Sequence, residues 1–403
     1  ECSSNKKNDM QIGIITYWSS DDNYGQQLQC YALQRFLRDK KHNAFLIKYK
    51  PTAEQKSKWD KLKGISIGKL LDKLSSAKRK EIAINKLLGN ENKELNKARM
   101  FEKFRNDHLN TTEIEYHSIE ELRQNPPEAE VYICGSDQVW NNSLHSKNTA
   151  GWYLDFGNPS IRRISYAASI GRNIEKGEQS TFKTYLNHLN AISVRESSAQ
   201  ALCQSLGFSN VEVVGDPTLL LSANHYLSLC KDIPKQEHPY LFMYMLNIST
   251  PEEIGWDKVS AYLQARSLDL KTVCSSGYLP ARELIPDNRN ILASIPEWIA
   301  LIRDARYVIT TSFHGMMFCI LLHKPFLVMK LTNQYAKGNN RMTSLLATLG
   351  IEERIHNSSL PFDRQMENEI NWTEVEKKLA ALRNNSIKFI ERNIKFPQNE
   401  STN

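Results

Sequence analysis

The fold is decided near the start of the chain, where QIGIIT (residues 11–16) precedes NYGQQLQCYALQRFL (23–37) and AFLIK (44–48). The first and third runs are short, apolar and bounded by polar residues, which is typical of buried strands. Between them, apolar residues recur at helical spacing from Leu28 to Leu37. A strand, a helix and a second strand in this order predict the first unit of a doubly wound α/β sheet.

The rest of the chain continues this alternation in two series. Strands are expected at 130–134, 164–170, 191–194 and 211–214, and then at 241–245, 271–274, 307–311 and 325–329. We therefore predict two Rossmann-like domains facing a central cleft. The expected bounds are 10–185 for the first domain, 186–385 for the second with its C-terminal helix, and 386–403 for a polar tail.

One segment carries the basic excess of the chain. The formal net charge is +7, and residues 50–107 hold 16 Lys and Arg against 8 Asp and Glu, so the remainder is close to neutral. We expect residues 52–108 to form a basic helical insertion in the N-terminal half. Such a segment is either a solvated helical face or a surface attracted to an anionic membrane. Few aromatics are interleaved with the charges, so nucleic acid is not an expected partner.

Composition indicates a globular protein of ordinary character. Of 403 residues, 40% are hydrophobic, and no apolar run is long enough for a transmembrane helix. The seven cysteines lie far apart and form no CxxC pair. This spacing predicts reduced, buried thiols in a cytoplasmic protein and no metal site.

Four polar clusters each follow a predicted strand. Because the carboxyl ends of parallel strands meet at one edge of an open sheet, these clusters are expected to converge on one cleft. Taken singly, each has a structural explanation, such as helix capping, a surface ion pair or a packing aromatic. The clusters are Asn23-Tyr24-Gly25, Gly135-Ser136-Asp137-Gln138 with Trp140, Arg195-Glu196, and Ser312-Phe313-His314-Gly315.

At these residues the chain resembles the polysaccharide pyruvyl transferase family. The resemblance is carried in order by residues 23–37, YICGSDQVWN (132–141), YLDFG (153–157), RISYAASIG (163–171), ISVRE (192–196), VVGDPTLLL (213–221) and TTSFHGMMFCILLHKPF (310–326). It does not cover the insertion or the tail. Gln26 and Gln27 stand where smaller residues are frequent in the family, a difference expected to affect acceptor contacts.

The resemblance implies a GT-B-like pair of domains and an activity. The enzyme would transfer pyruvate from phosphoenolpyruvate, its donor co-substrate, with no other cofactor. The product would be a cyclic ketal on a hexose of a capsule or exopolysaccharide precursor. The acceptor implied is polyprenyl-diphosphate-linked, so we expect a cytoplasmic protein with peripheral contact at the inner face of the membrane.

Ketal formation needs acid–base groups and cations, and the motifs supply both. Phosphoenolpyruvate carries two anionic groups, so its site needs arginine, lysine or helix N-termini. We expect His314 to transfer protons, Asp137 to deprotonate a sugar hydroxyl and Arg195 to hold an anion, and the opposite acid–base assignment is also chemically consistent. The expected substrate-binding residues are Asn23, Tyr24, Gly25, Gly135, Ser136, Gln138, Trp140, Ser169, Ser312, Phe313, Gly315, Lys330 and Arg341.

Two other functions fit the same architecture. A GT-B glycosyltransferase using a nucleotide sugar would need a carboxylate for the ribose after the fourth cluster, and none precedes Glu352 and Glu353. A non-catalytic sugar-binding protein would be expected to lack His314, Arg195 or Asp137, and all three are present.

Overall fold

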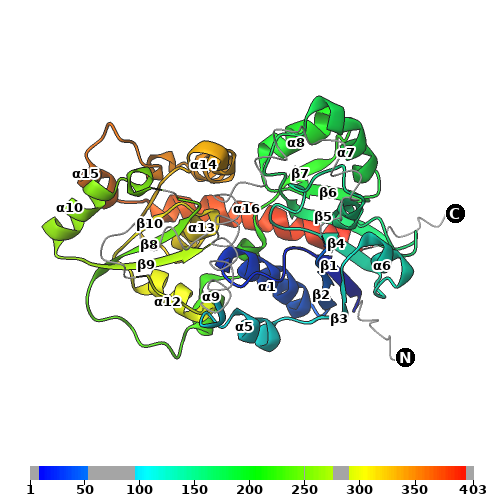
Figure 1. The fold of residues 1–403 in the computed structure, drawn as a ribbon, viewed down its shortest axis with the longest axis horizontal. Coiled ribbons are helices and arrows are strands. Elements are labelled where there is room, and N and C mark those ends of the chain that lie inside the picture. The colour runs from blue at the N-terminus through cyan, green and yellow to red at the C-terminus, as the bar shows by residue number, and fades with distance from the viewer. Residues whose placement is uncertain (1–8, 53–95, 249, 276–289, 396–403) are drawn as a thin grey trace, which may run out of the picture.

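The computed structural model describes residues 9–52, 96–248, 250–275 and 290–395. Two lobes lie side by side, each built on its own parallel sheet with helices packed on it (Figure 1). This architecture confirms the predicted pair of Rossmann-like halves.

The first sheet has seven strands in the order β3-β2-β1-β4-β5-β6-β7, all paired in parallel. The strand order reverses at β1, whose end therefore opens a crevice where α/β sheets bind ligands. The strands are β1 (Gln11–Ile15), β2 (Asn43–Tyr49), β3 (Thr111–Tyr116), β4 (Val131–Cys134), β5 (Arg162–Ala168), β6 (Ala191–Val194) and β7 (Val211–Val213).

The second sheet has four parallel strands in the order β11-β10-β8-β9. Its two central strands are almost wholly buried, which explains why their sequences are apolar without alternation. The strands are β8 (Tyr240–Leu246), β9 (Asp269–Ser275), β10 (Tyr307–Thr310) and β11 (Phe326–Val328).

The connections between strands are largely helical. The α-helices are α1 (Tyr24–Asp39), α5 (Phe101–His108), α6 (Ile119–Gln124), α7 (Gln179–Leu186), α8 (Ser197–Ser205), α9 (Ala223–Leu229), α10 (Trp256–Arg266), α12 (Ile295–Asp304), α13 (Phe313–Leu321), α14 (Asn339–Leu349), α15 (Phe362–Glu367) and α16 (Trp372–Asn393). Short 3-10 turns are η1 (Lys147–Tyr153), η2 (Lys176–Glu178), η3 (Pro217–Leu220), η4 (Pro251–Ile254), η5 (Asn333–Gly338) and η6 (Glu352–Arg354).

A shared core and one long helix join the two lobes. A single apolar cluster runs from Leu28 on α1 to Phe318 on α13. Helix α16 starts at the second lobe and ends against the first (Figure 1). There Ser386 accepts a hydrogen bond from the Gly215 amide at 2.8 Å. The lobes are therefore held together by continuous packing and not by a linker alone.

Two expected domain bounds are corrected. Strands β6 and β7 pair onto β5, so the first sheet continues to Val213 and the expected boundary at 185/186 cuts through it. The expected polar tail from 386 also begins inside α16, where Ser386, Phe389 and Ile390 are buried. The first error arose because the alternation of strands and helices does not mark which sheet a strand joins, and the second because α16 continues to Asn393.

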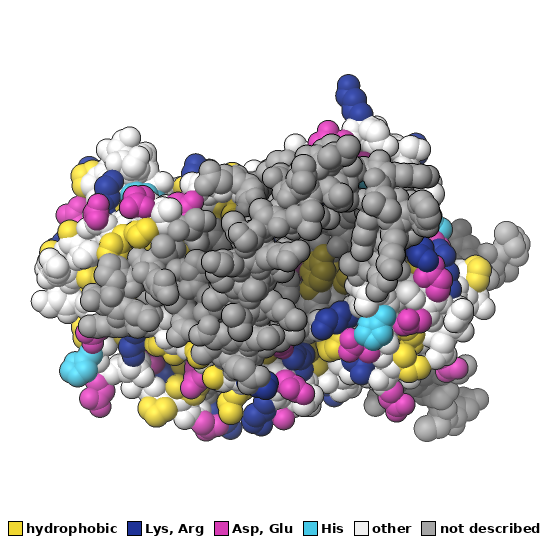
Figure 2. Space-filling view, in the orientation of Figure 1, with side chains coloured by type: hydrophobic (Ala, Val, Ile, Leu, Met, Phe, Trp, Pro, Cys, Tyr) yellow, Lys and Arg dark blue, Asp and Glu magenta, His cyan; other side chains and the backbone are white. Residues whose placement is uncertain are grey.

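Further expectations concern the basic insertion, the cysteines and membrane-spanning helices. The basic insertion falls mostly on residues 53–95, outside the described residues, although α5 at its end is helical as expected. The six described cysteines are free and buried, as predicted. Among the described residues, no helix combines the length and apolarity needed to cross a membrane. On the face shown in Figure 2, described basic side chains lie among acidic ones.

Candidate active site

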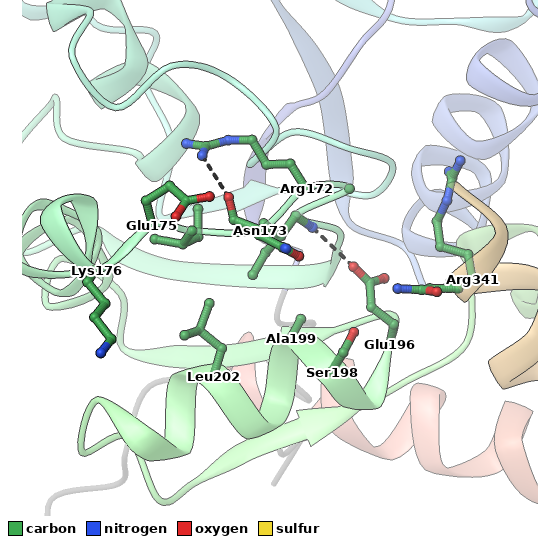
Figure 3. A pocket seen from close by; sticks show the side chains of 13 residues that line it. Arg172, Asn173, Glu175, Lys176, Glu196, Ser198, Ala199, Leu202 and Arg341 are labelled. Atoms are coloured by element: carbon green, nitrogen blue, oxygen red, sulfur yellow. Dashed lines mark hydrogen bonds between the residues drawn. The ribbon is translucent and has the colours of Figure 1, made fainter. Parts of the chain in front are cut away.

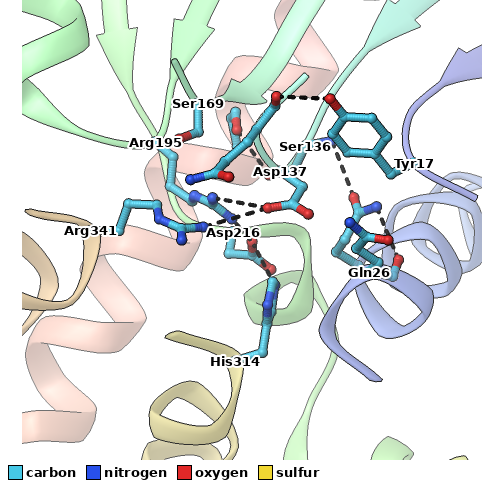
Figure 4. A network of polar contacts seen from close by, with 12 residues as sticks. Tyr17, Gln26, Ser136, Asp137, Ser169, Arg195, Asp216, His314 and Arg341 are labelled. Atoms are coloured by element: carbon cyan, nitrogen blue, oxygen red, sulfur yellow. Dashed lines mark hydrogen bonds and ion pairs between the residues drawn. The ribbon is translucent and has the colours of Figure 1, made fainter. Parts of the chain in front are cut away.

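Five charged side chains from both lobes meet between the two sheets (Figure 4). Asp137 follows β4, Arg195 follows β6 and Asp216 follows β7 in the first lobe. His314 lies in the first turn of α13 and Arg341 in the first turn of α14, both in the second lobe. The convergence predicted from strand ends is thus observed for Asp137, Arg195 and His314, and Asp216 and Arg341 join them.

Arg195 links two buried aspartates. Its Nη1 donates to Asp216 Oδ2 at 2.8 Å, and its Nη2 donates to Asp137 Oδ1 at 3.3 Å. Asp216 Oδ1 accepts from the amide and hydroxyl of Thr218 at 3.0 and 2.8 Å. Both ends of the guanidinium are therefore used within the protein, which makes Arg195 a positioning residue for the two carboxylates.

The charges around the aspartates determine their ionisation. Burial by itself raises the pKa of Asp216, but His314, Arg195 and the Thr218 amide outweigh burial and hold this pKa well below its usual range. Burial likewise raises the pKa of Asp137, and Arg195, His314 and Arg341 together bring it below its usual value. Both side chains are consequently carboxylates at neutral pH.

His314 is held between Asp216 and the start of α1. Its Nε2 lies 3.3 Å from Asp216 Oδ2, and its Nδ1 lies against Gly25. A Cβ on Gly25 would come within 2.0 Å of Nδ1, so only glycine leaves room for the imidazole. Ser312 caps α13 by accepting from the Gly315 amide at 3.2 Å and so fixes the turn that carries His314.

Of the two arginines in the cluster, Arg341 has the weaker pairing with other protein groups. Its only ion pair among the described residues is a long one, 3.5 Å from Nη1 to Asp137 Oδ1, and its Nε has no hydrogen-bond partner. Burial and the charge of Arg195 lower the pKa of Arg341 to about 10. The Arg195 and Arg341 guanidiniums lie 4.7 and 5.8 Å from the ring centre of Phe313. Arg341 can therefore accept an anionic ligand.

A pocket of about 400 Å³ opens in front of Arg341 (Figure 3). Charged side chains dominate its polar lining, with Arg172, Lys176, Glu175 and Glu196 joining Arg341. The Glu196 Oε1 accepts from the Ser169 hydroxyl at 2.8 Å and from the Ile170 amide at 3.1 Å. Ser169 thus positions Glu196 at the pocket. This chemistry suits a small ligand with several charged groups.

Two expected sugar-stacking aromatics lie in the core instead. Tyr24 is fully buried, stacks on Trp298 with ring centres 5.3 Å apart and receives a hydrogen bond from Arg99. Trp140 is also fully buried and stacks on Tyr153. Their expected contact with substrate is corrected, because packing between elements leaves neither ring face open.

The remaining expected residues mostly shape the loops. Ser136 is buried, donates to Ala167 O at 2.8 Å and supports the Asp137 loop. Gly135 has a φ of 111°, and a Cβ there would strike Tyr166 O. Asn23 caps α1 by accepting from the Gln26 amide, and Gly315 packs on Thr310. Gln138 is half-buried beside Gly171.

Lys330 is not brought into the cluster. It follows β11 and is exposed, and among the described residues no hydrogen bond or ion pair joins it to the charged group. Conversely, Asp216 was not among the expected site residues. Its position shortly after β7, within VVGDPTLLL, was a signal of the same kind as the four predicted clusters.

The described residues contain no group of three or more potential ligands arranged for a metal ion.

We expect Asp216→Asn to destabilise the fold by about 3–5 kcal/mol, because it leaves Arg195 and His314 without a charged partner in a buried site. Since the pKa of Asp216 is lowered by folding, its contribution is present above the unfolded value near 3.9 and is lost as pH falls below it. Urea unfolding at several pH values measures this loss. Asp39→Asn, in an exposed pair with Arg35, should cost less than about 1 kcal/mol. Equal costs would contradict the assignment.

Comparisons with known proteins agree with this architecture. The family model described as Polysaccharide pyruvyl transferase matches residues 23–332. No curated protein has a significant match to the chain. Among solved structures, UGT89C1 of Arabidopsis thaliana complexed with UDP-L-rhamnose is 9% identical with a TM-score of 0.51, covering 96% of this chain and 99% of that one. UDP-GlcNAc 2-epimerase of Neisseria meningitidis is 10% identical with a TM-score of 0.47, covering 95% and 99%. The likeness to UGT89C1 confirms a GT-B type fold and assigns no substrate.

Proposed function

Because the chain belongs to the polysaccharide pyruvyl transferase family and is therefore a transferase, we propose that it moves pyruvate from phosphoenolpyruvate onto two hydroxyls of a hexose, releasing phosphate. The observation that carries the proposal is the incompletely paired Arg341 at a charge-lined pocket, next to the His314–Asp216 pair. A donor with a phosphate and a carboxylate needs a cation beside a group that can move protons.

Arg341 supplies the anion contact in this proposal. Arg195 already donates to two aspartates, so its geometry differs from the expected role as the anion ligand. An anion would bind the donors of Arg341 that its long Nη1 contact to Asp137 leaves unused, through charge-assisted hydrogen bonds, which are short and strong. Lys176 lies in the same pocket and can contact the other end of the donor.

The proton transfers of the reaction can be carried by one acid–base group. A proton adds to the methylene carbon, the first hydroxyl adds to C2, phosphate leaves, and the second hydroxyl closes the ring. The two hydroxyls release two protons, of which one is gained by the methyl carbon and one by the phosphate. His314, paired with the ionised Asp216, is the group we assign to these transfers. Asp137 has a lowered pKa and is a weak base, so we assign it to orienting Arg341.

The acceptor in this proposal is a glycan precursor carried on a polyprenyl diphosphate. Such a precursor belongs to capsule or exopolysaccharide assembly and is presented at the cytoplasmic face of the membrane. The basic segment 50–107 remains the candidate for electrostatic contact with that surface. A direct test incubates the chain with phosphoenolpyruvate and lipid-linked hexoses, and measures phosphate release together with an acceptor mass gain of one pyruvate less one water. The same acceptors with nucleotide sugars form the competing arm.

We expect Arg341→Ala to raise the KM for phosphoenolpyruvate by about 10–100-fold, since a hydrogen bond to a charged group contributes about 1.5–3 kcal/mol. Arg341→Lys should recover only part of this loss, because an ammonium cannot reproduce the planar fork of donors. Arg364→Ala, on the remote helix α15, is the matched control. An unchanged donor KM in a folded Arg341→Ala protein would refute the anion site.

A further inference from the structure

A second pocket lies on the other side of the Asp137 loop. It has a volume of about 460 Å³ and opens where β1 and β2 end and α1 begins. Tyr17 joins the two regions, because its hydroxyl donates to Gln138 O at 3.3 Å and accepts from Asn142 at 3.0 Å. Figure 4 shows Tyr17 and Gln26 on the side of Asp137 away from Arg341. The second pocket therefore adjoins the loop that carries Asp137.

The second pocket differs from the first in its chemistry. Its walls are aromatic, with Tyr17 and Trp152 ring centres 4.9 Å apart and Trp18 also contributing. Its polar lining consists mainly of hydroxyls and amides, with one side chain of each charge, Asp22 and Lys50, whereas charged side chains dominate the pocket before Arg341. Aromatic surface combined with neutral hydrogen-bonding groups suits a ligand that is polar but uncharged.

Gln26 is the side chain most free to meet such a ligand. It is half-buried in the first turn of α1 and lines the pocket. Its backbone is hydrogen-bonded, but its side-chain amide forms no hydrogen bond within the described residues. The amide carries two donors and one acceptor oxygen, which matches the hydroxyls around a sugar ring.

We propose that this pocket is the acceptor subsite, in which a neutral hexopyranose lies against Tyr17 and Trp18 and hydrogen-bonds to Gln26. The inference rests on the proposed function for the reaction, but sugar binding at this place can be measured without it. A pyranose has an apolar C–H face and a rim of hydroxyls, so an aromatic wall beside amides recognises both.

The kinetic test separates the two substrates. Gln26→Ala should raise the acceptor KM by about threefold to tenfold, the effect of losing neutral hydrogen bonds, and leave the phosphoenolpyruvate KM unchanged. Trp18→Phe keeps a ring and should retain more acceptor affinity than Trp18→Ala. Gln264→Ala, an exposed glutamine on α10, is the matched control. If both the Gln26 and Trp18 variants keep the wild-type acceptor KM, the proposal is overturned.

The binding test uses no donor. Ligand-observed NMR with the methyl pyranosides of glucose, galactose, mannose and N-acetylglucosamine should give a signal for at least one of them. Gln26→Ala and Trp18→Ala should remove most of that signal, while Arg341→Ala should keep it. This pattern would support the sugar subsite even if no pyruvyl transfer is found. The absence of transfer would then refute only the proposed reaction. No signal from any sugar, or a signal unchanged in both pocket variants, overturns the subsite.

Discussion

Replacing His314 by alanine is expected to lower turnover by about 10²–10⁴-fold, the usual contribution of a positioned acid or base. The imidazole is the group of the charged cluster that we assign to proton transfer, because Asp137 and Asp216 both have lowered pKa values and are weak bases. Its Nε2 contacts the ionised Asp216, which orients the ring and offers a partner to an added proton. Steady-state phosphate release with a saturating acceptor measures the effect.

Two comparisons show whether the loss is chemical. The exposed His188, replaced by alanine, should leave turnover unchanged and controls for removal of any histidine. The KM for phosphoenolpyruvate should change much less than kcat in His314→Ala, because Arg341 still binds the anion. Turnover near the wild-type level in a folded His314→Ala protein would assign proton transfer to another residue.

The sequence predicted the architecture well because its strands are short apolar runs with clear breaks. The N-cap at Asn23, the capping box that Ser294 and Glu297 form on α12, and the apolar helix α13 all have strong local signals. Strand β3 escaped prediction because it lies at the edge of the sheet and its sequence, TTEIEY, is mostly polar. Apolar runs in a sequence indicate buried strands, so they do not reveal an edge strand that is only partly buried.

The sequence predicted those site residues whose place is determined by their position in the sheet. His314, Asp137, Arg195 and Arg341 do meet, since each lies near the end of a strand or the start of the next helix. The roles of Tyr24 and Trp140 were not predictable, because burial depends on helices that arrive from elsewhere in the chain. Pairing partners likewise decide that Arg195 donates to two aspartates, whereas Arg341 has only one long ion pair among the described residues.

Replacing Gly25 by alanine is expected to lower turnover by about 10²-fold, although the residue itself makes no chemical contact with a substrate in the proposed mechanism. The new Cβ would lie 2.0 Å from Nδ1 and 2.3 Å from Cγ of His314, so the imidazole must leave its place beside Asp216. A misplacement of about 1 Å is enough for a loss of this size. Gly177→Ala, where nothing lies within 4 Å of the added carbon, should have no effect.

The double variant Gly25→Ala/His314→Ala shows whether the loss of turnover in Gly25→Ala arises from displacement of the His314 imidazole. Residues in contact do not contribute additively, so the second substitution should cost little turnover once the first is present. The double variant should also be more stable than Gly25→Ala alone, because removing the imidazole removes the clash. If the two losses instead multiply, alanine at position 25 acts through the start of α1 and not through His314. Rates and urea midpoints for the four proteins of the cycle distinguish these outcomes.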